Sequence, residues 1–461
     1  MQLSRTACTI LTTLWIALSW AAATAKAQDP EPSDQAYGEV VSVYVVDIDV
    51  RVTDRDGNPV SGLSAADFTL REDGDEVEIT NFSEVPARPK PERPDESEEP
   101  TLDESVPSAL IVFVVDDTAI EPRNRKRAIE QIGAAIDRGF DPYTAATIAV
   151  IDGGLRILGQ PTGDATQLRA ALAQLGDAPP SGITRQRERD AELREVLIDV
   201  GETMSQFRSQ VIESNDAVRE LNALTRRVQT EVGRRRAENL DSFAAMGGLI
   251  EALARMPGRK AIVYTSQGLA MRPGQAALEV IREALAEISA RGDGEAFSAS
   301  VDARSAMLTA LDDQIRAQKR RPSRGNAPPQ DLIAVSALAA KAGVSFYAWK
   351  AQGNLGVASA EFGPEAGLAL TTSVRDARER SLTETLNVLA DETGGRVAIG
   401  AGFEELVERA IADFGGYYSL GFSPTHGGDN QLHKLKLKVR GRGLDVWYPR
   451  SYVALPPAGS R

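Results

Sequence analysis

Apolar residues in this chain follow three different spacings, and each spacing predicts a different kind of structure. Residues 38–85 alternate apolar and polar side chains, as at Val41, Val43 and Val45, between turns rich in Gly and Asp. This alternation is typical of the short strands of a β-sandwich. Residues 416–454 return to the same alternation after a long interval. The first set is too short to close its own core, so we expect the C-terminal strands to complete it.

Residues 108–415 have a second pattern, in which continuous apolar runs alternate with helical periodicity. The runs 109–116, 260–265 and 344–349 carry almost no polar residue before their ends. Such runs are typical of strands buried on both faces of a parallel sheet. Helical segments lie between them, and one ends at Gly394-Gly395, a common helix stop. The sequence therefore predicts an α/β fold with a doubly wound, mostly parallel sheet, joined to the first β-domain by an acidic, Pro-rich linker at 86–107.

Two helical insertions, 185–241 and 275–330, interrupt this α/β region. The first has the third spacing, a heptad repeat of apolar residues that predicts a narrow coiled-coil seam. If 185–241 were one continuous helix, it would extend about 80 Å. It could instead fold back as a hairpin, pack on the domain, or pair with another chain as an oligomer. The seam consists of Leu197, Val200, Met204, Phe207, Val211, Val218, Leu221, Val228 and Val232.

The charge of the chain narrows its possible partners. The formal net charge is −14, and the isoelectric point is about 4.9. Nucleic-acid binding needs a basic surface, and anionic membranes attract basic segments. We therefore expect neither partner.

Residues 1–27 have the pattern of a secretory signal peptide. Arg5 precedes an apolar run that ends in the small-residue site Ala25-Lys-Ala27. Cleavage would leave no membrane span and an exported protein, periplasmic or secreted; retention of the segment would make it an anchor. The one cysteine, Cys8, lies in this segment, so the mature chain would have no disulfide.

Polar side chains follow two of the predicted strands and begin one predicted helix. Asp116, Asp117 and Thr118 end the first strand, and Ser266 and Gln267 end another. Thr162 lies in Pro161-Thr-Gly-Asp164, which opens a helix. Ser266 lacks both the Gly-x-Ser-x-Gly setting and an evident histidine partner, so we expect no enzyme.

The only two histidines, His426 and His433, lie in or beside a Gly-rich turn. The sequence leaves open whether they bind a metal ion or face solvent.

Several ordered segments resemble the bacterial von Willebrand factor type A-related domain proteins of the acidobacterial type. They are 52–60, 62–68, the strand that ends at Asp116, 257–264, 389–396 and the aromatic residues Tyr417, Tyr418 and Tyr452. The resemblance covers most of the chain after the signal segment. It implies a von Willebrand factor A-like domain that grips protein ligands at the carboxyl ends of its strands, often through a divalent cation.

The resemblance also implies a metal-ion-dependent adhesion site, which is degenerate here. Asp116 matches its first Asp, Thr118 replaces a Ser, and Thr162 is taken as the second-loop Thr. Gln267 replaces an Asp, and Ile120 replaces the last Ser and cannot ligate. The expected site would bind Mg²⁺, or Ca²⁺ or Mn²⁺, weakly; the alternative is a relict loop in which Asp116 caps the following helix.

Asp117, Ser266 and Gln267 would complete the ligand-binding face around this site. The resulting hypothesis is an exported, non-enzymatic protein-binding module of the adhesion type. The alternative is a structural or assembly protein of an envelope complex that acts through its coiled-coil-like insertion.

Overall fold

The computed structural model describes residues 45–86, 109–179, 183–271, 273–291, 330–351, 367–426, 428–429 and 431–454. For residues 183–191, 330 and 367–379 it describes the backbone alone. The expected signal segment 1–27, nearly all of the expected linker, and residues 292–329 lie outside the described residues.

A six-stranded sheet forms the centre of the α/β region. Its spatial order is β10-β9-β8-β5-β6-β7. If these six strands are renumbered 1 to 6 in chain order, the sheet reads 3-2-1-4-5-6 from β7 to β10. Five strands are parallel, and only the edge strand β7 is antiparallel. Every residue of β5 and β6 is buried, which explains their continuous apolar runs. The strands are β5 (Ala109–Asp116), β6 (Thr144–Ile151), β7 (Leu155–Ile157), β8 (Arg259–Ser266), β9 (Val344–Lys350) and β10 (Arg396–Ile399).

Helices cover both faces of this sheet, and each face has its own apolar core. The first core receives the C-terminal part of α4 (Ser214–Ala254), α7 (Gln330–Lys341) and α8 (Gly367–Thr393). The second receives α1 (Pro122–Arg138), α2 (Ala165–Asp177) and α9 (Phe403–Ala412). The expectation of an α/β fold with a mostly parallel, covered sheet is confirmed.

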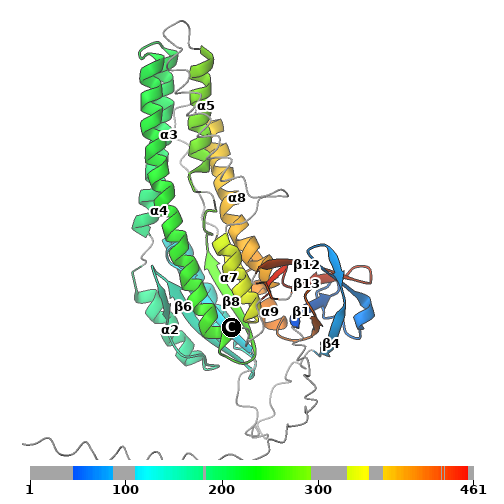
Figure 1. Cartoon of the computed structure of the whole chain (residues 1–461). Coiled ribbons are helices and arrows are strands. Elements are labelled where there is room, and N and C mark those ends of the chain that lie inside the picture. The colour runs from blue at the N-terminus through cyan, green and yellow to red at the C-terminus, as the bar shows by residue number, and fades with distance from the viewer. Residues whose placement is uncertain are drawn as a thin grey trace, which may run out of the picture. The chain divides into compact units, whose positions relative to one another are not determined.

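The first helical insertion folds back on itself. Helix α3 (Ile183–Arg208) ends before a turn, and α4 begins at Ser214, so 185–241 is not one continuous helix. Gln210 takes a positive φ of 57° in this turn, which reverses the chain direction. Helices α3, α4 and α5 (Gln275–Arg291) lie side by side (Figure 1) around a third apolar core. Most of the heptad seam is therefore covered within the chain, and Val211, at 71% exposure, is the clearest exception.

Helix α4 takes part in two cores. Its N-terminal part contributes Leu221 and Val228 to the three-helix core, and its C-terminal part contributes Met246 and Ile250 to the sheet. A helix of 41 residues extends about 60 Å. The insertion is thus continuous with a helix that the α/β fold requires.

Strands from both ends of the described chain form two antiparallel sheets. One has the order β13-β1-β11-β4 and the other β14-β12-β2-β3. Strand β11 lies between β1 and β4, and β12 pairs with β2, so N-terminal and C-terminal strands share one core. The strands are β1 (Val46–Thr53), β2 (Phe68–Glu72), β3 (Asp75–Val77), β4 (Ile79–Val85), β11 (Tyr417–Phe422), β12 (Leu432–Val439), β13 (Asp445–Trp447) and β14 (Ser451–Val453).

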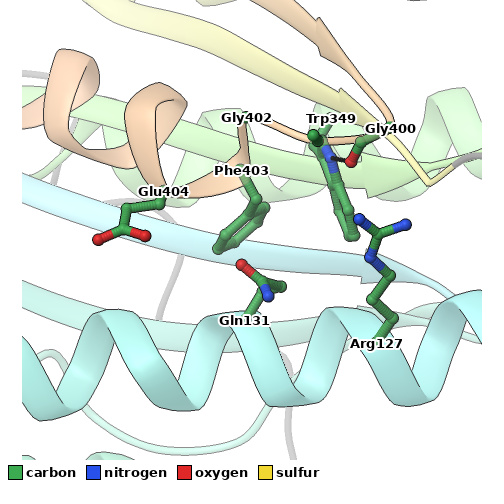
Figure 2. A pocket seen from close by; sticks show the side chains of 8 residues that line it. Arg127, Gln131, Trp349, Gly400, Gly402, Phe403 and Glu404 are labelled. Atoms are coloured by element: carbon green, nitrogen blue, oxygen red, sulfur yellow. Dashed lines mark hydrogen bonds between the residues drawn. The ribbon is translucent and has the colours of Figure 1, made fainter.

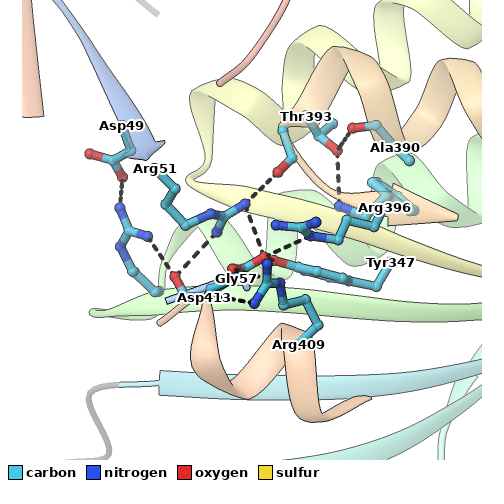
Figure 3. A network of polar contacts seen from close by, with 12 residues as sticks. Asp49, Arg51, Gly57, Tyr347, Ala390, Thr393, Arg396, Arg409 and Asp413 are labelled. Atoms are coloured by element: carbon cyan, nitrogen blue, oxygen red, sulfur yellow. Dashed lines mark hydrogen bonds and ion pairs between the residues drawn. The ribbon is translucent and has the colours of Figure 1, made fainter. Parts of the chain in front are cut away.

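A buried carboxylate connects these β-strands to the α/β sheet. Asp413 follows α9 and accepts a 2.6 Å hydrogen bond from the hydroxyl of Tyr347 in β9. Arg51 of β1 lies 3.4 Å from its carboxylate, and Arg396 and Arg409 lie at 3.6 and 4.0 Å (Figure 3). One carboxylate thus contacts charged groups from both regions of the chain.

The C-terminal aromatic residues divide between core and contact roles. Tyr418, Tyr448 and Tyr452 are buried in the core of the antiparallel sheets. The guanidinium groups of Arg259 and Arg396 lie 3.3 and 3.7 Å from the ring centres of Tyr417 and Trp447, respectively.

Across the described residues, no helix combines the length and apolar character that a membrane crossing requires.

Candidate functional site

The order in which strands are added to the sheet reverses between β5 and β8. Doubly wound folds commonly bind ligands at the carboxyl ends of the strands at such a point. Asp116, the last residue of β5, lies at this point and is 0% exposed. One of its carboxylate oxygens accepts hydrogen bonds from the backbone N–H (3.0 Å) and hydroxyl (2.5 Å) of Thr118. The other accepts a 2.5 Å bond from the hydroxyl of Tyr264 in β8. Both oxygens therefore have donors from the protein itself.

Burial dominates the electrostatics of this pair. It raises the pKa of Asp116, although the bonds from Thr118 and Tyr264 act in the opposite direction. Burial also raises the pKa of Tyr264 well above its ordinary value, and the neighbouring carboxylate adds to the effect. Tyr264 is thus held as a neutral donor.

The structure does not bring Thr162 to Asp116, which corrects the predicted ligand set. Thr162 forms a bridge with Ala146 near the start of β6, whereas Asp116 pairs with Ile151 at its end. Ile151 lies five positions after Ala146, a distance of about 16 Å along a strand. The chain continues past the edge strand β7 toward the amino edge of the sheet, so Thr162 lies at the wrong end.

Ser242 of α4 supplies the second hydroxyl that the sequence interpretation assigned to Thr162. Its oxygen lies 3.3 Å from the hydroxyl of Thr118, and the side chain is buried. The available signal was a single Ser at the start of the apolar stretch of α4, 242–253. Such a residue is common in helices, and only the packing of α4 on the sheet distinguishes it.

The loop after β8 closes over the same point. Ser266 is buried, its hydroxyl accepts a 3.0 Å bond from the N–H of Gly268, and the N–H of Gln267 donates to the carbonyl of Ala119 at 2.8 Å. Gly268 has a φ of +97°, and a Cβ there would lie 2.2 Å from the carbonyl oxygen of Leu382 in α8. The backbone of α8 thus packs directly against the backbone of this loop.

Asp117 is also engaged in packing contacts rather than exposed on a binding face. It is 2% exposed and forms a 2.7 Å ion pair with Arg125, which donates to the carbonyl of Leu175 at the same distance. Burial raises the pKa of Asp117 despite the opposing effect of Arg125. This contact connects the end of β5 to α1 and α2.

These residues do not fit a bound Mg²⁺ ion. Mg²⁺ requires near-octahedral oxygen ligands and keeps several waters. Here Asp116 is joined by the hydroxyl of Thr118, but Ile120 has no ligand atom, Gln267 brings no charge, and Thr162 lies near the other edge of the sheet. The alternative, in which Asp116 caps the following helix, is wrong as well: Asp116 accepts bonds from Thr118 within the loop, and the residue at the N-cap of α1 is Glu121.

A cavity of about 180 Å³ lies elsewhere on this edge, beyond the ends of β9 and β10. The indole of Trp349 and the ring of Phe403 meet edge to face there, with centres 4.9 Å apart. Figure 2 shows Arg127 and Gln131 directed from α1 toward these rings. The lining residues are Arg127, Gln131, Trp349, Gly400, Ala401, Gly402, Phe403 and Glu404.

The mouth of the cavity carries a cationic group. The guanidinium of Arg127 is exposed and lies 5.8 Å from the Trp349 ring centre. Glu404 forms an ion pair with Arg138, near the other end of α1. Among the described residues that line the cavity, the ionisable side chains are Arg127 and Glu404.

Comparison with known proteins yields no match, either to a protein-family model or to a curated protein.

Proposed function

We propose that this protein is an exported, non-enzymatic protein-binding module with a von Willebrand factor A-like α/β domain. Its binding face is the carboxyl edge of the parallel sheet, and the cavity beside Trp349 receives a side chain of the partner. Export rests on the signal-like segment 1–27, and the domain assignment on the ordered segments that resemble this family.

The size and position of the cavity carry this proposal. Small-molecule sites usually enclose about 300–1,000 Å³. A cavity of about 180 Å³ suits one side chain better than a cofactor or a whole substrate. It lies where ligands of doubly wound sheets commonly bind, and its floor is aromatic.

The charges at the mouth favour one class of partner segment. Arg127 lies beside the rings, while the carboxylate of Glu404 is paired with Arg138. An apolar side chain could fill the aromatic floor while a neighbouring carboxylate of the partner meets Arg127. Aromatic pockets flanked by arginine are frequent sites of strong contacts in protein interfaces.

This proposal moves the binding face away from Asp116. A cation-dependent adhesion mechanism would need further ligands beside Asp116, and Thr162, the ligand expected from the second loop, lies near the other edge of the sheet. The assembly alternative gains little support, because most of the heptad seam packs against α5 within the chain.

Site-specific photocrosslinking in the native host tests the proposal. A photoreactive residue at Gln131, which lines the cavity while Arg127 stays in place, should give one discrete adduct with a partner protein. The same residue at Lys126 is the matched control, because Lys126 is exposed on the same helix but does not line the cavity. Equal adducts from both positions, or none from Gln131, would contradict the proposal.

A second pair of variants tests the cavity itself. Ala401 is exposed and lines the cavity, so Ala401→Trp should fill it and abolish the adduct. Ala412 is exposed at the end of α9 and does not line it, so Ala412→Trp should leave the adduct intact. An adduct that persists in Ala401→Trp would show that the partner does not use this cavity.

A further inference from the structure

The two histidines of this chain meet in the folded structure, although they lie in a loop and a strand. Their rings stack with centres 4.4 Å apart and planes inclined by 11°. His426 follows β11 and is exposed, whereas His433 is the second residue of β12 and is 5% exposed. A chain that contains only two imidazole groups has thus placed them in contact.

A third possible ligand completes the group. Glu72, the last residue of β2, is 1% exposed, and one potential ligand atom from each of Glu72, His426 and His433 lies within 4.8 Å of the other two. Burying an ionisable carboxylate is costly unless it has partners. The site is closed on the Glu72 side and open on the His426 side, which gives an ion a route of entry.

Two further carboxylates surround the buried imidazole. Asp73 lies 2.8 Å from Nδ1 of His433 and 3.8 Å from Nε2 of His426, and Asp429 lies 3.0 Å from Nε2 of His433. Three carboxylates therefore face two imidazoles. The local formal charge stays negative even if both rings are protonated, which favours a divalent cation.

We propose that Glu72, His426 and His433 bind a divalent transition-metal ion such as Zn²⁺, which ties the β2 end to the β11–β12 connection. Two imidazole nitrogens and one carboxylate suit Zn²⁺ better than Mg²⁺ or Ca²⁺, which prefer oxygen ligands alone. A tetrahedral ion with bonds of about 2.0–2.2 Å places its ligands about 3.3 Å apart. Because each imidazole binds through a lone pair in the plane of its ring, the exposed His426 ring would turn out of its stack with His433 and move inward to reach the ion.

The surrounding contacts orient the proposed ligands. Glu72 accepts bonds from the backbone N–H (3.1 Å) and hydroxyl (3.0 Å) of Thr425 and from the hydroxyl of Tyr452. Both ring nitrogens of His433 bond to carboxylates, Nδ1 to Asp73 and Nε2 to Asp429. The ion would displace one of these carboxylates, and the other nitrogen would keep its N–H bond. Such outer contacts fix the ring and typically change metal affinity by about 10–100-fold.

This site is independent of partner binding, because none of its residues lines the cavity at Trp349. Calorimetric titration of ZnCl₂ into the chelator-treated full chain near neutral pH tests it. We expect one ion per chain and a rise in the unfolding temperature. His426→Ala should weaken binding at least tenfold and remove the temperature rise.

Matched variants make the result specific. Lys436 is exposed on the same strand as His433, so Lys436→Ala should bind Zn²⁺ like the wild type. MgCl₂ should give no binding that His426→Ala removes. The proposal is overturned if wild-type protein shows no saturable Zn²⁺ binding, or if His426→Ala binds as tightly as the wild type.

Discussion

Replacing Asp413 by alanine should destabilise the contact between β1 and the α/β sheet more than any exposed ion-pair change. Asp413 is 3% exposed and faces Arg51, which is also buried. Burial alone would lower the pKa of Arg51, but Tyr347, Asp413 and Asp49 outweigh it and raise that pKa. The guanidinium therefore remains charged in a setting that depends on the carboxylate.

The expected cost follows from these contacts. Removing one partner of a buried ion pair costs about 3–5 kcal/mol, because the other charge stays buried. The hydroxyl of Tyr347 also loses its acceptor. Arg396 and Arg409 are partly exposed and add little, and Arg51 keeps its bonds to the carbonyls of Asp413 and Gly394. We therefore expect about 3–5 kcal/mol in total.

Native-state hydrogen exchange of β1 and β9 measures this effect. Since about 1.4 kcal/mol corresponds to a factor of ten, exchange through this opening should accelerate by roughly 100-fold to several thousand-fold. Glu76→Ala is the control, because its ion pair with Arg71 is exposed and is worth at most about 1 kcal/mol. Exchange in Asp413→Ala that equals exchange in Glu76→Ala would refute the reasoning.

Three further predictions concern other parts of the structure. Burial raises the pKa of Asp116 above its ordinary 3.8, so the folded state binds the carboxyl proton more tightly than the unfolded state, and the free energy of unfolding falls as pH rises from about 4. In urea titrations, the gain in the free energy of unfolding of Asp116→Asn over wild type should therefore increase with pH and vanish in acid. Gly395→Ala should severely destabilise the protein in thermal melts, since its Cβ would lie 1.8 Å from a backbone oxygen, while Gly201→Ala, with open space around it in α3, should stabilise by about 0.5–1 kcal/mol; similar melts for both would contradict this. Leu221→Ala should cost about 2–5 kcal/mol because Leu221 is fully buried between helices, and Val211→Ala should stay within about 0.5 kcal/mol, as chemical denaturation would reveal.

The secondary structure of the α/β region could be predicted because the burial of a strand determines which of its own residues are apolar. A strand covered on both faces needs apolar residues at every position, and 109–116 has them up to its final Asp. The heptad seam could also be predicted from the sequence, but the element that packs against it could not. The same apolar seam suits a hairpin, a domain surface or a second chain, and the turn at Gln210 decides among them.

The candidate site shows what could not be predicted from the sequence. The end of β5 was correctly expected to place Asp116 and Thr118 together, because they are neighbours in the chain. Thr162 was assigned to the same site from its order in the sequence, yet its bridge to Ala146 places it near the amino edge. Ser242, from the middle of a 41-residue helix, lies there instead.

By itself, the sequence determined the alternation of strands and helices, the acidic net charge and the presence of only two histidines. These properties depend on composition and on side chains a few residues apart. Only the tertiary structure decided that Asp116 is closed off by Tyr264, that the two histidines stack beside Glu72, and that the seam is covered by α5. Each of these depends on strand register and helix packing between segments far apart in the chain, where periodicity fixes which face is apolar but not which neighbour covers it.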